Sequence, residues 1–122
     1  MVKGMEVAHE EDVLRCGELE VRPAEGLVQA DGPTLTLSVR ELELLVALVR
    51  HAGRVVRRED LYRLVWGGQL RPGDRSIDVY VHKLRSKLER ALPDRAYIHT
   101  HVGFGYRLSP ERVTDRTLRG AR

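Results

Sequence analysis

The sequence predicts an α+β domain in which a small antiparallel sheet of four short strands, three helices and a β-hairpin follow one another along the chain. Three observations lead to this prediction. Short β-favouring runs separated by glycine and proline fill the region before residue 38. Three stretches with a helical repeat of apolar residues occupy the middle of the chain. An alternating stretch with a glycine-rich turn lies near the end.

Length and composition favour one folded domain. The 122 residues can bury a single modest core, and 42% hydrophobic with 32% charged residues is typical of a globular chain. The longest uncharged apolar stretch has six residues, far fewer than the roughly 20 that cross a bilayer. A single cysteine, Cys16, allows no internal disulfide. We therefore expect a cytoplasmic protein with no membrane association.

Charge is distributed unevenly along the chain. Residues 1–31 contain three basic and eight acidic residues, whereas residues 71–122 contain twelve basic and six acidic ones. The formal net charge of the whole chain is +3. A cationic C-terminal half attracts polyanions, so nucleic acid is the leading class of partner.

The folded domain is predicted over residues 13–109. Residues 1–12 lack periodicity and contain four acidic residues, so we expect a disordered linker or an expression remnant. Residues 110–122 are expected to form a frayed tail. The four predicted strands are 13–16, 19–22, 27–30 and 34–37. So narrow a sheet is expected to lie against helices.

The first helix is predicted to begin at Ser38. Ser38 and Glu41 have the spacing of a capping box, in which each side chain bonds to the backbone amide of the other residue. Gly53 is expected to end the helix. Its apolar stripe contains Leu42, Leu45, Val46 and Val49.

A second helix is predicted over residues 58–66, after a short extended link at 54–56. Glu59 and Asp60 lie in its first turn, where the helix dipole favours negative charge. Residues 67–74 contain three glycines and a proline, so they are predicted to form a loop.

A third helix, predicted over residues 75–92, has two contrasting faces. The apolar face contains Ile77, Tyr80, Val81, Leu84, Leu88 and Ala91. The opposite face is polar and basic and contains Arg75, Val79, His82, Lys83, Ser86 and Arg90. Residues 97–108 then alternate around the turn Gly103-Phe104-Gly105, as expected for a β-hairpin. Three helices followed by a hairpin predict a winged helix-turn-helix, whose last helix enters the major groove of DNA.

An ordered set of motifs runs through these elements. It comprises Leu37-Ser38 with Glu41, Gly53-Arg54-Val55-Val56 with Arg58-Glu59 and Leu61, Val65-Trp66-Gly67, Arg75-Ser76-Ile77-Asp78-Val79-Tyr80-Val81 with Leu84-Arg85 and Lys87-Leu88, and Thr100 with Gly103-Phe104-Gly105-Tyr106. In this order the motifs resemble the OmpR/PhoB-type effector domain of bacterial response regulators, over about residues 13–108.

The resemblance implies a four-stranded N-terminal sheet, a recognition helix over about 75–91 and a wing over 97–108 on the DNA backbone or in the minor groove. It implies sequence-specific binding of double-stranded DNA at direct-repeat sites by a protein that is monomeric alone and a head-to-tail dimer on DNA. By position, Arg75, Tyr80, His82 and Arg85 would lie at phosphates and Lys83 would read bases. The predicted DNA-binding set is Arg75, Tyr80, His82, Lys83, Arg85, Lys87, Arg90, Thr100 and His101.

The resemblance also implies further partners. The loop residues Gly68, Gln69, Leu70 and Arg71 would face RNA polymerase. Members of the family are usually joined to an upstream receiver domain of a two-component phosphorelay, and we do not expect that domain within these 122 residues.

The sequence departs from the family pattern at two positions. Val102 stands where family wings commonly carry an arginine that enters the minor groove. Lys83 stands where arginine is frequent, and lysine lacks the planar fork that matches guanine. These changes predict softer sequence discrimination, or discrimination shifted to His101 and to DNA shape.

Other chemistries are less well supported by the residues. His99 and His101 point the same way on the predicted hairpin, but without a nearby cysteine pair we expect surface or phosphate-contacting roles and neither a metal nor a cofactor. Asp78 is interpreted as a first-turn residue paired with an arginine and not as a catalytic acid. Trp66, Phe104 and Tyr106 are expected to pack inward.

We therefore expect no enzymatic activity. The alternative to DNA binding is a winged-helix module that contacts RNA polymerase or a partner domain and has little affinity for DNA. The acidic sheet and Val102 motivate this alternative.

Overall fold

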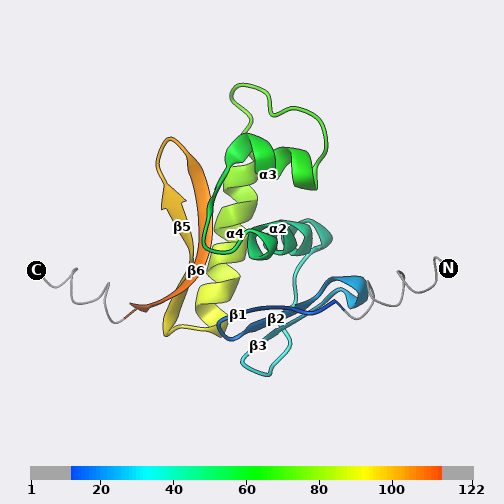
Figure 1. Cartoon of the computed structure of the whole chain (residues 1–122), viewed down its shortest axis with the longest axis vertical. Helices are drawn as coiled ribbons and strands as arrows, with labels where there is room; N and C mark the ends of the chain where they lie inside the picture. The colour runs from blue at the N-terminus through cyan, green and yellow to red at the C-terminus, as the bar shows by residue number, and fades with distance from the viewer. Residues whose placement is uncertain (1–11, 114–122) are drawn as a thin grey trace, which may run out of the picture.

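The computed structural model describes residues 12–113 (Figure 1). The linker predicted at residues 1–12 lies outside the described residues except for Asp12, and the frayed tail predicted at residues 110–122 lies outside them from residue 114 onward. Across residues 12–113, every helix is too short or too polar to traverse a bilayer.

The N-terminal sheet has three antiparallel strands, β1 (Leu14–Cys16), β2 (Leu19–Arg22) and β3 (Leu27–Ala30), in that spatial order. A short 3-10 turn, η1 (Pro23–Glu25), joins β2 to β3. Alternate residues of β2 and β3 are buried, so one face of this sheet lies on the core.

The fourth predicted strand, 34–37, is reduced to a single bridge between Gln29 and Thr34. Leu35 N–H donates to the Val28 carbonyl oxygen at 2.8 Å, but pairing stops there. The chain must next turn into the following helix, whose cap Ser38 already has an extended backbone outside the sheet. The predicted four-stranded sheet is thus a three-stranded sheet extended by one isolated bridge.

Helix α2 (Val39–Arg50) begins as predicted. Ser38 Oγ accepts a hydrogen bond from the Glu41 amide at 3.2 Å, and Glu41 Oε1 accepts one from the Ser38 amide at 2.8 Å. The buried surface of α2 is shifted from the predicted stripe, because Leu44 and Leu48 are fully buried with Leu45, whereas Leu42 and Val46 are only partly buried. In Figure 1, α2 crosses the middle of the molecule with the N-terminal sheet on one side and α3 on the other, and α4 runs past it.

The region predicted as a short extended link forms a strand, β4 (Val55–Arg57), and leads directly into helix α3 (Arg58–Val65). Helix α4 (Ser76–Ala91) follows the 67–74 loop. The predicted positions of both helices are therefore correct to within one residue at each end.

The C-terminal hairpin consists of β5 (Arg95–His101) and β6 (Gly105–Arg112), and β4 pairs with the other edge of β6. A side chain at Gly105 would collide with the backbone carbonyl of Val56, so glycine is needed for β4 to lie against β6. Strand β6 is paired as far as Arg112, so regular structure continues past the predicted domain boundary at residue 109.

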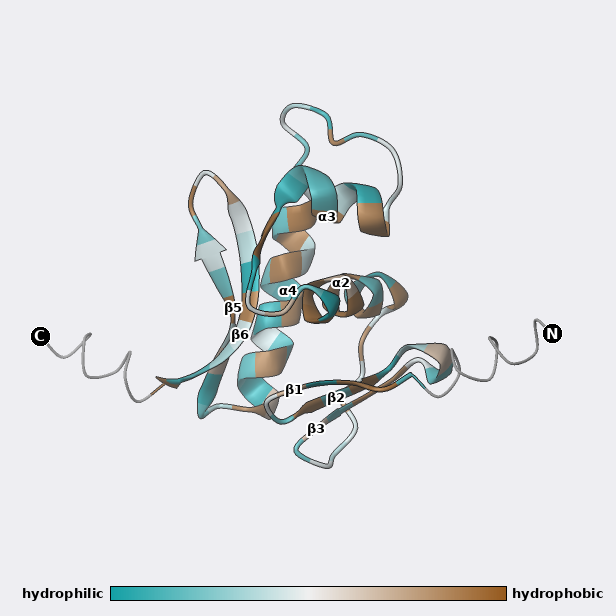
Figure 2. Ribbon diagram, viewed as in Figure 1, coloured by the Kyte–Doolittle hydropathy of each residue, from teal (hydrophilic) through white to brown (hydrophobic). Residues whose placement is uncertain are grey.

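The core lies where α2, α3 and α4 meet the two sheets. Hydrophobic stretches of these elements are brown in Figure 2. The fully buried leucines of the core are Leu19, Leu44, Leu45, Leu48, Leu61, Leu84, Leu88 and Leu108. Tyr97 of β5 is also buried, and its hydroxyl accepts a hydrogen bond from the Glu18 amide at 2.8 Å in the β1–β2 turn. This contact ties the hairpin to the N-terminal sheet.

Candidate nucleic-acid interface

Helix α4 has the two faces that its sequence predicts. Ile77, Val81, Leu84 and Leu88 are at most 1% exposed. The residues exposed along the helix and at its start are Arg75, Val79, His82, Lys83, Glu89, Arg90 and Ala91. Ala91, the last residue of α4, was expected on the apolar face but is exposed. The exposed face is predominantly basic.

The N-terminal turn of α4 is fixed by Asp74, a residue that the sequence analysis placed in the loop without a role. Asp74 Oδ1 accepts hydrogen bonds from the Ser76 amide at 2.8 Å and from the Ser76 hydroxyl at 2.6 Å. These bonds lower the pKa of Asp74. A carboxylate that accepts from the backbone amide two residues later forms an Asx turn, which leads the chain into the helix.

Asp78, in the first turn of α4, joins three parts of the fold. Arg58 of α3 donates two hydrogen bonds to its carboxylate, at 3.2 and 2.9 Å, and the Tyr106 hydroxyl of β6 donates one at 2.6 Å. Arg75 Nε lies 3.3 Å from Asp78 Oδ2. The recognition-helix candidate is therefore held at its start by both α3 and the hairpin.

The contacts around Asp78 change the pKa of Asp78 and of the Tyr106 hydroxyl. Burial alone would raise the pKa of Asp78, but the hydrogen bonds from Arg58 and Tyr106 bring it below its usual value. Burial, together with the hydrogen bond to Asp78, raises the pKa of Tyr106 to about 12. The network therefore favours an ionised aspartate and a neutral phenol.

Arg85 and Thr100, both predicted to contact DNA, contact each other. Arg85 Nη2 donates to Thr100 Oγ1 at 2.7 Å, and Arg85 Nε donates to the Ile98 carbonyl oxygen at 3.3 Å. The guanidinium thus connects α4 to β5.

Lys87 lies at the opposite boundary of the basic face and turns toward α2. Its ammonium donates to Glu41 Oε1 at 2.7 Å and to the Thr36 carbonyl oxygen at 3.2 Å. The Glu41 side chain is 5% exposed. Among the residues that the structure describes, Glu41 is the only buried charged residue, and it is paired with a lysine that was predicted to contact DNA.

Tyr80 is half-buried and links Lys83 to an aromatic cluster. Lys83 Nζ lies 5.0 Å from the centroid of the Tyr80 ring, and Tyr80 packs edge-on against Trp66. Trp66 stacks on Tyr62 and carries the Arg40 guanidinium on its ring. Trp66 packs inward as predicted, while Lys83 and His82 are exposed.

The two histidines of β5 are bound within the hairpin. His99 Nε2 lies 2.7 Å from the Ser109 carbonyl oxygen, and His101 Nε2 accepts a hydrogen bond from Arg107 at 3.1 Å. His101 is half-buried beside the wing turn. Arg107 also donates to Glu111 at 3.2 Å.

The wing turn corrects one prediction. Tyr106 is buried as expected, but Phe104 is 71% exposed. Strand β4 ends with Arg57 opposite Gly105, so the turn extends beyond the neighbouring strand and Phe104 has no surface there to pack against.

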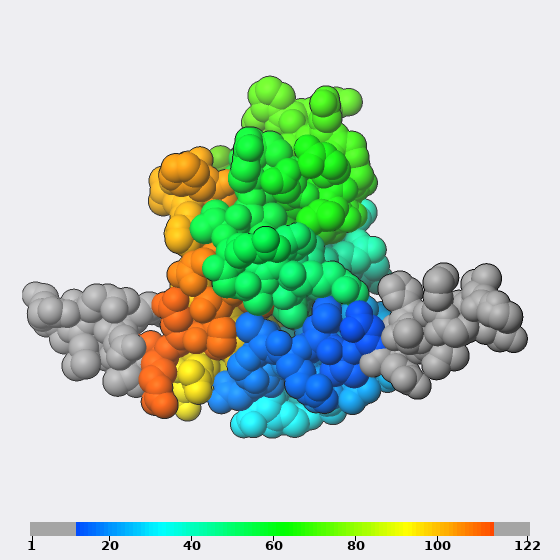
Figure 3. Space-filling model, viewed as in Figure 1, coloured from blue at the N-terminus to red at the C-terminus, as the bar shows by residue number. Residues whose placement is uncertain are grey.

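The predicted polymerase-contact loop stands clear of the helices at the top of Figures 1 and 3. Gly68, Gln69 and Arg71 are exposed, and Leu70 is half-buried. The loop begins and ends beside α3 and α4, at the end of the molecule where α4 starts.

Comparison with known proteins identifies the domain. The family model described as "Transcriptional regulatory protein, C terminal" matches residues 32–108. The chain belongs to this family. The match covers α2, α3, the 67–74 loop, α4 and the wing, which carry all the candidate residues above.

Curated relatives of this regulatory domain are longer proteins. The transcriptional regulatory protein SphR of Synechococcus elongatus, named for alkaline phosphatase synthesis, is 40% identical over 96 residues, which are 79% of this chain and 37% of SphR. The transcriptional regulatory protein CpxR of Klebsiella pneumoniae is 38% identical over 93 residues, 76% of this chain and 40% of CpxR. The chain thus spans about two fifths of the length of these relatives.

Solved structures share the fold. The DNA-binding domain of Klebsiella pneumoniae RstA, in complex with the RstA box, has a TM-score of 0.72 and 29% identity, covering 81% of this chain and 98% of that one. The DNA-binding domain of Escherichia coli CpxR has a TM-score of 0.71 and 36% identity, covering 81% and 97%. The α+β winged helix-turn-helix prediction is confirmed.

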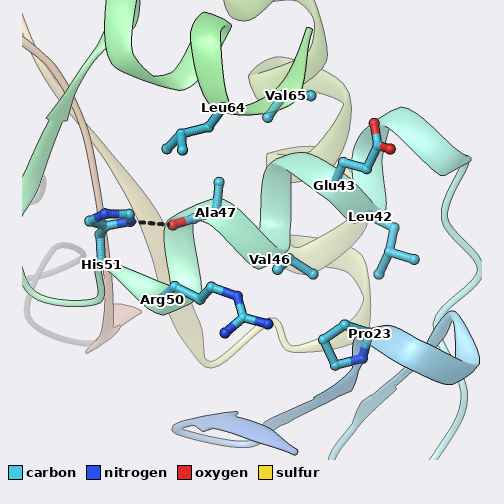
Figure 4. A pocket seen from close by; sticks show the side chains of 9 residues that line it. All are labelled: Pro23, Leu42, Glu43, Val46, Ala47, Arg50, His51, Leu64 and Val65. Atoms are coloured by element: carbon cyan, nitrogen blue, oxygen red, sulfur yellow. Dashed lines mark hydrogen bonds between the residues drawn. The ribbon is translucent and has the colours of Figure 1, made fainter. Parts of the chain in front are cut away.

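The regulatory domain also has a pocket of about 350 Å³ away from α4 and the wing (Figure 4). Leu42 and Val46 of α2 and Leu64 of α3 point toward it, with Pro23 of η1 and Arg50 at its edge. None of its lining residues belongs to the basic face, so the pocket is separate from the candidate interface.

Proposed function

We propose that this domain binds double-stranded DNA with sequence specificity, as the DNA-binding part of a transcriptional regulator. The exposed basic face of α4, opposite a fully buried apolar stripe, carries the proposal. An α-helix with its side chains is 10–12 Å wide and fits the major groove, which is about 12 Å wide. The RstA domain, solved with its DNA box, supports it by similarity.

Within this proposal, some of the predicted residues contact DNA and the others hold α4 or its side chains in position. Lys83, exposed in the middle of α4, would reach base edges. The other exposed residues of the predicted set on this face, His82, Arg75 and Arg90, would reach phosphates. Arg85 and Lys87 would act through Thr100 and Glu41, by holding α4 against the wing and α2. Tyr80 would position the Lys83 ammonium.

The test compares two exposed cations of α4. Lys83→Ala is expected to cost about 1–3 kcal/mol of discrimination at one base position, whereas Arg75→Ala should weaken recovered and scrambled duplexes equally. The duplexes are recovered from a library with a randomised core, and affinities are measured by fluorescence anisotropy. Arg15→Ala, on the acidic sheet, is the control.

Two outcomes would contradict the proposal. Equal effects of Lys83→Ala and Arg75→Ala on all duplexes would mean that the orientation of α4 is wrong. Weak binding by the unchanged protein, with no preference among sequences, would favour the module that contacts RNA polymerase or a partner domain.

The proposal also includes the arrangement of two copies on DNA and a contact with RNA polymerase. Head-to-tail binding to direct repeats and contact of residues 68–71 with RNA polymerase are supported by family membership and by the projecting loop. A Gln69→Ala, Arg71→Ala double variant is expected to bind DNA normally and to lose stimulation of transcription in a purified system. Lost DNA binding would place the loop in the DNA interface instead.

A further inference from the structure

The wing turn carries two exposed apolar side chains. Val102 is 88% exposed and Phe104 is 71% exposed. The turn itself is well defined, since the Phe104 amide donates to the His101 carbonyl oxygen at 2.8 Å and Gly103 adopts a φ of 84°. Glycine at this position permits a reversal within three residues. Both side chains therefore project from a fixed backbone, and Figure 2 colours both sides of the turn as hydrophobic.

The cations of the hairpin are held along its strands and not at its tip. Arg107 of β6 is bonded to His101 and Glu111. Arg85 reaches the hairpin only as far as Thr100. Residues 102–104 contain no charged side chain, so the tip can contribute apolar contact and no ion pair.

The apolar tip lies beside a basic residue at the start of α4. A hollow of about 430 Å³ separates the two and is lined by Arg58, Glu59, Arg75, Asp78 and residues 100–106. The carboxylates of Asp78 and Glu59 are paired with Arg58 and Arg57. The side chain of Arg75 is 76% exposed. A phosphate on the rim of this hollow would have a cation on one side and an apolar tip on the other. This arrangement complements the edge of a DNA groove, where sugars and base edges lie between phosphates.

We propose that Val102 and Phe104 form an apolar wedge that contacts sugars and a base step in the minor groove next to the site of α4. The inference rests on the proposed DNA-binding function. Apolar side chains inserted into a minor groove act by partly unstacking a base step, and pyrimidine–purine steps unstack most easily. The wedge therefore favours such a step at a fixed distance from the bases read by α4.

The wedge makes an affinity contribution that does not depend on salt. Replacement of Phe104 by alanine removes an aromatic contact but no cation, so the slope of log affinity against log salt concentration stays unchanged. The expected loss of affinity is about tenfold, within the range measured when an aromatic contact to a base is removed. Arg75→Ala, in contrast, lowers both the affinity and the slope.

The experiment measures the unchanged chain and four variants on one duplex recovered from a randomised-core library and long enough for a single copy. Phe104→Ala is expected to bind about tenfold more weakly with an unchanged salt slope, and Phe104→Leu to retain most of the affinity. Val39→Ala, which truncates a side chain 74% exposed on α2, is the matched control. Arg75→Ala supplies the reference change in slope. A repeated selection with Phe104→Ala should lose the preferred pyrimidine–purine step.

Unchanged affinity of Phe104→Ala would overturn the wedge, as would a loss accompanied by a lower slope. An effect seen only on longer duplexes that hold two copies would also overturn it, since the tip would then contact protein. If the unchanged chain binds every library duplex weakly and equally, the proposed DNA-binding function itself fails. That result is distinct from a wedge failure, in which sequence preference in the α4 site remains.

Discussion

At the scale of single residues, the side chains at the edges of the basic face of α4 hold the helix in place. Arg85 and Lys87 lie on opposite sides of α4, where the buried stripe meets the exposed face. Arg85 is bonded to the wing and Lys87 to α2. The helix is thus held on both flanks, and only the side chains between these flanks are free to face a ligand.

The Lys87–Glu41 pair leads to a prediction about stability. Lys87→Met is expected to lower the free energy of unfolding by about 1–3 kcal/mol, because it leaves the buried Glu41 carboxylate without its cation. Urea denaturation measures the loss. Lys83→Met is the matched control on the same helix and should change stability by less than about 0.5 kcal/mol, since Lys83 is exposed. If Lys87→Met weakened DNA binding as much as Lys83→Met while stability was unchanged, Lys87 would be a DNA contact.

Helical periodicity could predict which residues lie at the centres of the two faces of α4, but not which groups the residues at the edges of those faces contact. A period of 3.6 residues places Lys83 opposite Val81 and Leu84 without further information. Whether Arg85 meets solvent or a threonine depends on the position of β5, thirteen or more residues later in the chain. The inward turn of Lys87 likewise depends on Glu41, 46 residues earlier.

At the scale of elements, the joint between α3, α4 and the wing depends on one carboxylate. Arg58, Asp78 and Tyr106 come from three different elements and meet through hydrogen bonds of 2.6–3.2 Å. The direction of α4 relative to the wing is therefore fixed by polar contacts as well as by packing. Such a joint keeps the two candidate DNA-contacting elements in one geometry.

Tyr106 makes this joint sensitive to alkaline pH. Its pKa is raised from 10.0 to about 12 in the folded protein, so the folded state holds the phenolic proton more tightly than the unfolded state. The stabilisation is complete below about pH 10 and is lost as the pH rises from about 10 to about 12, by of order 2 kcal/mol. In urea denaturation across this range, Tyr106→Phe should lose less stability than the unchanged chain. The control variant Tyr62→Phe should lose as much stability as the unchanged chain. An equal alkaline loss in Tyr106→Phe would place the sensitive group elsewhere.

The elements differ in how far their sequences could predict them. The capping box at Ser38 and Glu41 is local, so the start of α2 was predictable. Strand β4 was missed because Val55–Arg57 is too short to show a period, and its partner β6 lies about 50 residues away. The exposure of Phe104 depends on where β4 ends, so it could not be inferred from the hairpin alone.

At the scale of the whole molecule, opposite charges lie on different parts of the fold. Acidic residues gather around the N-terminal sheet, including Glu18, Glu20 and Glu25, whereas the exposed face of α4 is basic. A duplex approaching this molecule is attracted at α4 and repelled at the sheet. The charge pattern therefore orients the domain before any base is contacted.

This orientation predicts a strong dependence of DNA affinity on salt. Arg75, Lys83 and Arg90 are exposed on α4, and Arg57 is exposed on the neighbouring β4. If three to five phosphates are neutralised, the slope of log affinity against log salt concentration should be about −2.7 to −4.5. Fluorescence anisotropy over a series of KCl concentrations measures it. Arg90→Ala should make the slope shallower by about one, while Arg15→Ala on the acidic sheet should leave it unchanged. A flat profile for the unchanged chain would show that the basic face of α4 does not meet the duplex, because ion release must accompany any contact of these cations with phosphates.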